Sequence, residues 1–307
     1  MAVAVVLAAG AAFLSALAIV FQRVALESAP ATGSLSPRLI IHALSKRGWL
    51  VGFALMLGTF ALQASALHFG QLSLVQPVLT TELVFLVAIL VVGFHRTIGW
   101  REIAGIAAIV AGLACFFASA SPAVGTGQPG ADAWIAVTAC VVAGALALVA
   151  AGRAGPRWWR AAALGAGAAT LFAYNAALAK TMTWLLGHGG VPHLFATPDP
   201  YLIALSGASG LFVLQGSLHS GPVTASRTAN VVVNPLVSIV IGVTAFGEHL
   251  RSGPLFVVLD VIAIAILCSG IAVLARSPLV TGLGGGSAAD EYLGQPTLAP
   301  PAPAAPS

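Results

Sequence analysis

One acidic residue, Glu82, lies in the middle of a long apolar stretch, residues 71–94. A carboxylate at the centre of a bilayer costs about 2.5 kcal/mol or more to insert, so we expect Glu82 to face the interior of the protein. There it could bind a cation or carry a proton, because burial disfavours the charged form of a carboxyl group. The alternative is that Glu82 serves only as a structural ion-pair partner of Arg227.

Arg227 lies near the start of another apolar stretch, residues 222–246. Its long side chain could extend to the membrane interface and leave its charge in water. It could instead reach inward to Glu82, in which case the pair would act as a counter-ion switch that a substrate or a proton releases. Both alternatives stay open at this point.

Several amide side chains, Gln215 among them, fall within apolar stretches, where they supply donors and acceptors near the middle of the membrane. The four that we single out as candidate binding residues are Gln63, Gln76, Asn175 and Asn234. Pro77 and Pro235 follow two of them, and each removes a backbone donor and leaves a carbonyl free. We expect these amides, with Glu82 and Arg227, to line a polar cavity for a substrate or coupling ion. For each single amide, the alternative is a hydrogen bond between helices.

The elements that must position these residues are membrane-spanning helices. Of the 307 residues, 59% are hydrophobic and only 7% are charged, against about a quarter charged in soluble domains. The apolar stretches are 2–22, 49–68, 71–94, 103–120, 133–152, 161–187, 200–219, 222–246 and 254–275. At about 1.5 Å per residue, each can cross a hydrocarbon layer of about 30 Å. The composition predicts an all-α polytopic membrane protein with nine transmembrane helices.

The basic residues predict the orientation. If the N-terminus lies outside, ten of them fall on the cytoplasmic side and Arg251 alone falls outside. The ten are Arg23, Arg38, Lys46, Arg47, Arg96, Arg101, Arg153, Arg157, Arg160 and Arg276. By the positive-inside rule this bias predicts a plasma (inner) membrane protein with a cytoplasmic C-terminus. The basic residues are spread over short loops rather than gathered in a stripe, which argues against nucleic acid as a partner.

Two pairs of segments indicate an internal repeat. Residues 60–70 (FALQASALHFG) match residues 212–221 (FVLQGSLHSG), and residues 7–16 match residues 164–173. Matching helices are five spans apart, so the two halves would cross the membrane in opposite senses, as in many secondary transporters. We therefore expect a transporter domain over 1–276, with repeats at about 2–120 and 161–276, a connector helix at 133–152, and a disordered cytoplasmic tail at 277–307.

The repeat places charged residues at equivalent positions in the two halves. Arg23 aligns with Lys180, and Glu102 aligns with Asp260 when Gly112 is set against Gly270. We hypothesise two ion pairs that act as gates, Arg23 with Glu102 near the inner face and Lys180 with Asp260 in the outer third. The alternative is that these are ordinary interfacial charges.

Short motifs carry a family resemblance over roughly residues 2–276. They are Phe21-Gln22-Arg23, Trp49-Leu50-Val51-Gly52, Met56-Leu57-Gly58, Leu74-Val75-Gln76-Pro77 and Phe246-Gly247-Glu248. With them the chain resembles the drug/metabolite transporter (EamA-like) superfamily, most closely its NIPA-like magnesium transporter branch. The resemblance implies a secondary transporter without a cofactor. Magnesium is one implied substrate, with Glu82 as the metal ligand, although Thr59 stands where the NIPA-like pattern has glutamate.

An enzyme is the class that we exclude. Gly207-Ala208-Ser209-Gly210 is similar to the nucleophile motif of intramembrane serine proteases. However, Ser209 and His219 would lie about 15 Å apart along one helix, whereas a nucleophile and its base must be in hydrogen-bond contact.

The sequence therefore predicts an alternating-access transporter of a small polar solute or cation, with proton coupling through Glu82 as one option. A divalent-cation transporter and a membrane scaffold without transport are the alternatives. The expected partners are the lipid bilayer and the substrate, and faces rich in small residues are compatible with a homodimer.

Overall fold

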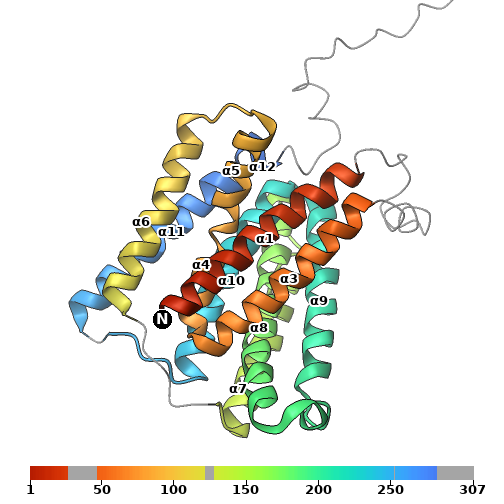
Figure 1. The fold of residues 1–307 in the computed structure, drawn as a ribbon, viewed down its shortest axis with the longest axis vertical. Helices are drawn as coiled ribbons and strands as arrows, with labels where there is room; N and C mark the ends of the chain where they lie inside the picture. The colour runs from red at the N-terminus through yellow and green to blue at the C-terminus, as the bar shows by residue number, and fades with distance from the viewer. Residues whose placement is uncertain (27–46, 122–127, 252, 282–307) are drawn as a thin grey trace, which may run out of the picture.

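The computed structural model describes residues 1–26, 47–121, 128–251 and 253–281, and they form an all-helical bundle (Figure 1). Nine spans in these ranges are long and apolar enough to cross a membrane. The helices are α1 (Ala2–Leu26), α3 (Arg47–Phe69), α4 (Leu72–Leu79), α5 (Glu82–Phe94), α6 (Trp100–Ala120), α7 (Ala131–Ala151), α8 (Arg157–Phe195), α9 (Asp199–Ser220), α10 (Val223–Thr244), α11 (Pro254–Ala275) and α12 (Pro278–Thr281). The expected all-α polytopic membrane architecture is confirmed, with span ends within a few residues of those predicted.

The end of the chain differs in part from the expectation of a tail beginning at residue 277. The short helix α12 follows α11 directly, and its start is fixed by a hydrogen bond from the Leu279 N–H to the Ser277 hydroxyl oxygen. Residues 282–307 of the predicted tail lie outside the described residues.

The third span, expected as one helix over 71–94, consists of two helices. α4 ends at Leu79 and α5 begins at Glu82, with Thr80 and Thr81 between them. Pro77 cannot donate a backbone hydrogen bond, which weakens the helix just before this break. The Thr80 hydroxyl donates to the Pro77 carbonyl at 2.6 Å and the Thr81 hydroxyl to the Val78 carbonyl at 2.7 Å. The break is thus satisfied internally, as hydrocarbon surroundings require.

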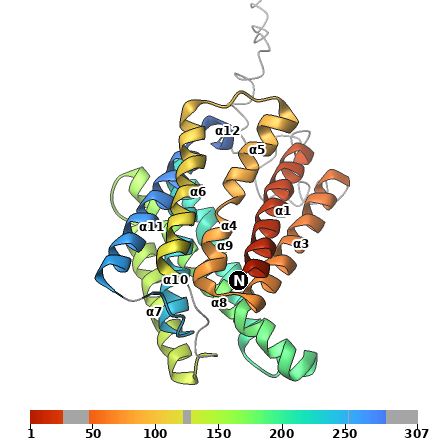
Figure 2. The ribbon, with the colours of Figure 1, turned by 60° about the vertical axis from the view of Figure 1, so that its left-hand side comes forward.

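The long helices pack mainly in pairs. α1 lies along α3, α8 along α9, and α6 along α11, while α10 packs on α8 and on α4. Figures 1 and 2 show the α6–α11 pair on one side of the bundle and the α1–α3 pair on another. The buried faces of α1 and α8 are mostly alanine, for example Ala8 and Ala12 in α1 and Ala173 and Ala177 in α8. Such small side chains let membrane helices approach closely.

Glycines bring α6 and α11 into backbone contact. A Cβ atom on Gly270 would lie 2.7 Å from the backbone nitrogen of Ile109 and 2.8 Å from the carbonyl oxygen of Gly105. A Cβ atom on Gly112 would lie 2.5 Å from the backbone nitrogen of Leu267. Because these neighbours are backbone atoms, they cannot rotate aside, and only glycine fits at either position.

This contact predicts that Gly270→Ala destabilises the protein. Overpacking a tight site costs about 1–3 kcal/mol, which outweighs the gain of about 0.5–1 kcal/mol from alanine in a helix. Thermal unfolding of the detergent-purified protein should show a lower Tm. Gly144→Ala is the matched control, because a Cβ atom at this α7 position meets nothing within 4 Å. Equal Tm values for the two variants would contradict the contact.

Candidate functional site

A polar cavity of about 290 Å³ lies between α1, α3, α4, α5 and α10, and we call it the central cavity. It is lined by Ser15, Thr59, Gln63, Gln76, Leu79, Thr80, Glu82, Leu83, Arg227, Asn230, Val231, Asn234 and Pro235. Five of the six predicted binding residues are in this set, although they come from three separate regions of the chain. The fold therefore brings together Glu82, Gln63, Gln76, Asn234 and Arg227.

Glu82 is the first residue of α5, directly after the break in the third span. A carboxylate in the first turn of a helix interacts favourably with the helix dipole. Ser15 of α1 and Arg227 of α10 line the same cavity as Glu82. Glu82 and Arg227 nevertheless do not form an ion pair in the described part of the chain. Arg227 lines the cavity and is also an exposed residue.

Two amides of the central cavity have buried polar atoms without a hydrogen-bond partner. They are the Nε2 atom of Gln76 and the Oδ1 atom of Asn234. An unpaired buried polar atom costs about 1–3 kcal/mol, so a polar ligand that pairs with these atoms would be stabilised in the cavity.

Asn175, the sixth predicted binding residue, does not line the central cavity. Its Nδ2 atom donates to the carbonyl of Ile203 at 2.7 Å and to the hydroxyl of Ser206 at 3.0 Å. Both acceptors are in α9, so Asn175 joins α8 to α9. This is the interhelical role that the sequence left as the alternative.

Lys180, predicted to pair with Asp260, instead forms an ion pair with Glu248 at 2.5 Å. Glu248 is 2% exposed as a residue, and its side chain is fully buried. It also accepts hydrogen bonds from the backbone N–H of Leu72 at 2.6 Å and of Ser73 at 2.9 Å, at the start of α4. One buried carboxylate therefore joins α8, the segment after α10 and the N-terminus of α4.

The two acids predicted as gates accept hydrogen bonds from serines. The Ser119 hydroxyl at the end of α6 donates to Asp260 in α11, and the Ser277 hydroxyl after α11 donates to Glu102 in α6 at 2.7 Å. Each acid thus links α6 to the α11 segment, one at either end of the pair. The side chain of Arg23, the predicted partner of Glu102, lies outside the described residues.

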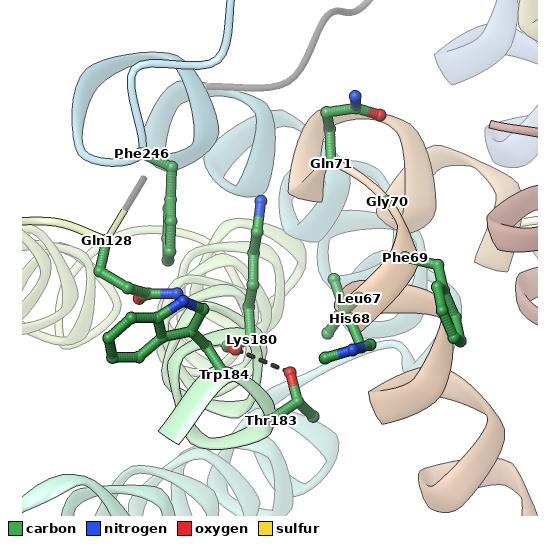
Figure 3. Close-up of a pocket in the computed structure, with 10 residues that line it drawn as sticks. All are labelled: Leu67, His68, Phe69, Gly70, Gln71, Gln128, Lys180, Thr183, Trp184 and Phe246. Atoms are coloured by element: carbon green, nitrogen blue, oxygen red, sulfur yellow. Dashed lines mark hydrogen bonds between the residues drawn. The ribbon is translucent and has the colours of Figure 1, made fainter. Parts of the chain in front are cut away.

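A second pocket, of about 260 Å³, lies at the end of the bundle where the chain begins, and we call it the end pocket (Figure 3). It is lined by Leu67, His68, Phe69, Gly70, Gln71, Gln128, Lys180, Thr183, Trp184 and Phe246. Figure 3 shows the Lys180 side chain extending between Phe246 and the segment around Gln71. Its ammonium lies 4.6 Å from the centre of the Phe246 ring, a cation–π contact. The Lys180–Glu248 pair therefore forms part of the wall of this pocket.

Sequence reasoning missed two groups of site residues. Glu248 lies two residues after the eighth apolar stretch, where an acid resembles an ordinary interfacial charge. Ser15, Thr80 and Asn230 are small polar residues of kinds that are common in membrane helices. For these residues, only the three-dimensional arrangement separates a cavity residue from a helix contact. For Glu248 the sequence held a signal, because Gly247-Glu248 belongs to one of the motifs that carry the family resemblance.

Comparisons with known proteins do not assign a family. No family model matches the chain, and no solved structure matches it. An uncharacterized protein of Corynebacterium glutamicum is 27% identical to it over 237 residues, which cover 76% of this chain and 80% of the relative.

The arrangement around Glu248 predicts strong coupling to Lys180. Glu248→Gln should leave the Lys180 ammonium without its counter-charge, and breaking a buried pair costs about 3–5 kcal/mol. The loss in the free energy of unfolding of the double variant Lys180→Met/Glu248→Gln should be smaller than the sum of the losses of the two single variants, by about 0.5–3 kcal/mol. Unfolding of the purified proteins measures this cycle. Additive effects would show that the ion pair contributes nothing to stability.

Proposed function

We propose that the protein is a secondary transporter that moves a small polar solute or cation through the central cavity by alternating access. The observation that carries the proposal is a carboxylate at a break in a membrane-spanning helix, facing a polar cavity with unpaired amide atoms. Secondary transporters build their binding sites from such discontinuous helices near the midplane. A membrane scaffold would need neither a carboxylate inside the membrane nor an inverted repeat.

An inverted repeat is part of the proposal, and the contacts between α6 and α11 support it. Gly112 packs on Leu267 and Ala263, and Gly270 packs on Ile109 and Gly105. When Gly112 is aligned with Gly270, these partner positions align with each other as well. A twofold axis between the two helices would produce this reciprocity.

Two further sets of residues follow the same alignment. Glu102 aligns with Asp260 and Ser119 with Ser277, so the two acid–serine hydrogen bonds are equivalent. Gln76-Pro77 aligns with Asn234-Pro235, and both amides face the central cavity. The cavity would then lie between matching segments of the two halves, where rocking of the halves would open it to each side in turn.

The Lys180–Glu248 ion pair is a candidate gate at one end of the bundle. It holds the N-terminus of α4 against α8 and borders the end pocket. Under the orientation predicted by the basic residues, this end faces outside. We therefore retain a gating role for Lys180, with Glu248 in place of Asp260 as its partner.

Magnesium fits the central cavity less well than a polar solute. Magnesium is usually bound through one or two carboxylates together with waters, and the central cavity holds the carboxylate of Glu82 beside the positive charge of Arg227. Across the described ranges, no three His, Cys, Asp or Glu side chains converge in a way that could hold a metal ion.

Uptake into proteoliposomes tests the transport proposal. With an imposed proton gradient, and with divalent cations and polar metabolites as candidate substrates, the wild type should accumulate a solute. Glu82→Gln should lose gradient-driven uptake, because the amide cannot bind and release a proton at neutral pH. Asp132→Asn, at an exposed position in the first turn of α7, is the matched control. Unchanged gradient-driven uptake by Glu82→Gln would remove this residue from the mechanism.

Reporter fusions test the proposed orientation in a plasma (inner) membrane. A fluorescent protein that matures only in the cytoplasm, fused after Ser307, should fluoresce, whereas alkaline phosphatase at the same point should be inactive. Fusions after Gly130, at the start of α7, should behave in the opposite way. The reverse result at both positions would place the N-terminus in the cytoplasm.

A further inference from the structure

We propose that the central cavity recognises a small zwitterion, a solute that carries both an ammonium group and a carboxylate, as an amino acid does. This inference rests on the proposed function and names the substrate class of the same site. Its basis is that Glu82 and Arg227 line one cavity without pairing with each other.

The charges argue against a ligand of one sign. A cation bound at Glu82 would lie in the field of Arg227, and an anion bound at Arg227 would lie in the field of Glu82. Like charges at close range disfavour binding. A ligand with both charges can place its ammonium at Glu82 and its carboxylate at Arg227, so that both protein charges are compensated.

The polar groups near each charge suit this orientation. Arg227, Asn230 and Asn234 are spaced at three and four residues on α10, which places them on one face of the helix. The Arg227 guanidinium can hold a carboxylate through two parallel hydrogen bonds. The unpaired Oδ1 atom of Asn234 can accept a hydrogen bond from the ligand, and the unpaired Nε2 atom of Gln76 can donate one.

The size and the apolar wall of the cavity limit the body of the ligand. A volume of about 290 Å³ lies just below the range of about 300–1,000 Å³ for small-molecule sites. Leu79, Leu83 and Val231 supply the apolar part of the wall. The cavity thus fits an amino acid with a short or aliphatic side chain better than a nucleotide or a large drug.

Equilibrium binding to the detergent-purified full chain tests the inference. The probes are glycine, L-serine and L-leucine, the corresponding amides, which lack the carboxylate, and 4-methylpentanoate, which is leucine without its amine. At least one amino acid should bind about tenfold or more tightly than its amide, and leucine should bind more tightly than 4-methylpentanoate. If all three amino acids fail to bind, or if an amide or Mg²⁺ binds as tightly, the zwitterion assignment is wrong.

Two variants assign each charge to its partner. Arg227→Gln should remove the preference for the amino acid over its amide, and Glu82→Gln should remove the preference for leucine over 4-methylpentanoate. Arg101→Gln and Asp132→Asn, both at exposed positions, should keep both preferences. Preferences that survive in the Arg227 and Glu82 variants would overturn the assignment even if the wild type binds amino acids.

Counterflow in proteoliposomes separates this inference from the proposed function. If amino acids bind with the expected selectivity but no probe exchanges across the membrane, the transport proposal fails and the binding inference stands. If amides or Mg²⁺ exchange as rapidly as amino acids, the protein is a transporter and the zwitterion inference fails.

Discussion

The hydrocarbon core of a membrane offers no hydrogen-bond partner, so each polar group in the spanning region must find one within the protein. This constraint accounts for the all-helical fold and for the way in which the third span breaks. The hydroxyls of Thr80 and Thr81 bond to carbonyls at the break, and Glu248 accepts the first N–H groups of α4. Among the described residues, nine buried side-chain polar atoms depart from this rule, and two of them, Gln76 Nε2 and Asn234 Oδ1, belong to residues that line the central cavity. A ligand in this cavity could supply their missing partners.

The fold could be predicted largely from composition, because a span of about 20 apolar residues has few alternatives in a bilayer. What composition could not predict is the division of the third span into α4 and α5. Pro77 was visible in the sequence, but a proline kinks some membrane helices without interrupting them, and the position of the break depends on hydrogen bonds made by Thr80 and Thr81.

The site could be predicted in part. Glu82 and the amides of three spans were found because polar groups are rare and costly inside a membrane, and the cavity collects most of them. The partner of Lys180 was not found, because pairing depends on the path of the chain after α10, which brings Glu248 back into the bundle. Asn175 was predicted to line the cavity and does not, because the same amide chemistry serves equally well to join α8 to α9.

The glycine contact between α6 and α11 has a mechanical consequence. Two helices that touch through backbone atoms, and that are tied at both ends by acid–serine hydrogen bonds, cannot slide past each other without separating. If the protein works by rocking of its two halves, the α6–α11 pair would therefore be the rigid part about which the other helices move. Displacement would then fall on the segments around Thr80 and Pro235, where the helical hydrogen bonding is already interrupted. The residues that line the central cavity would therefore lie on the moving parts.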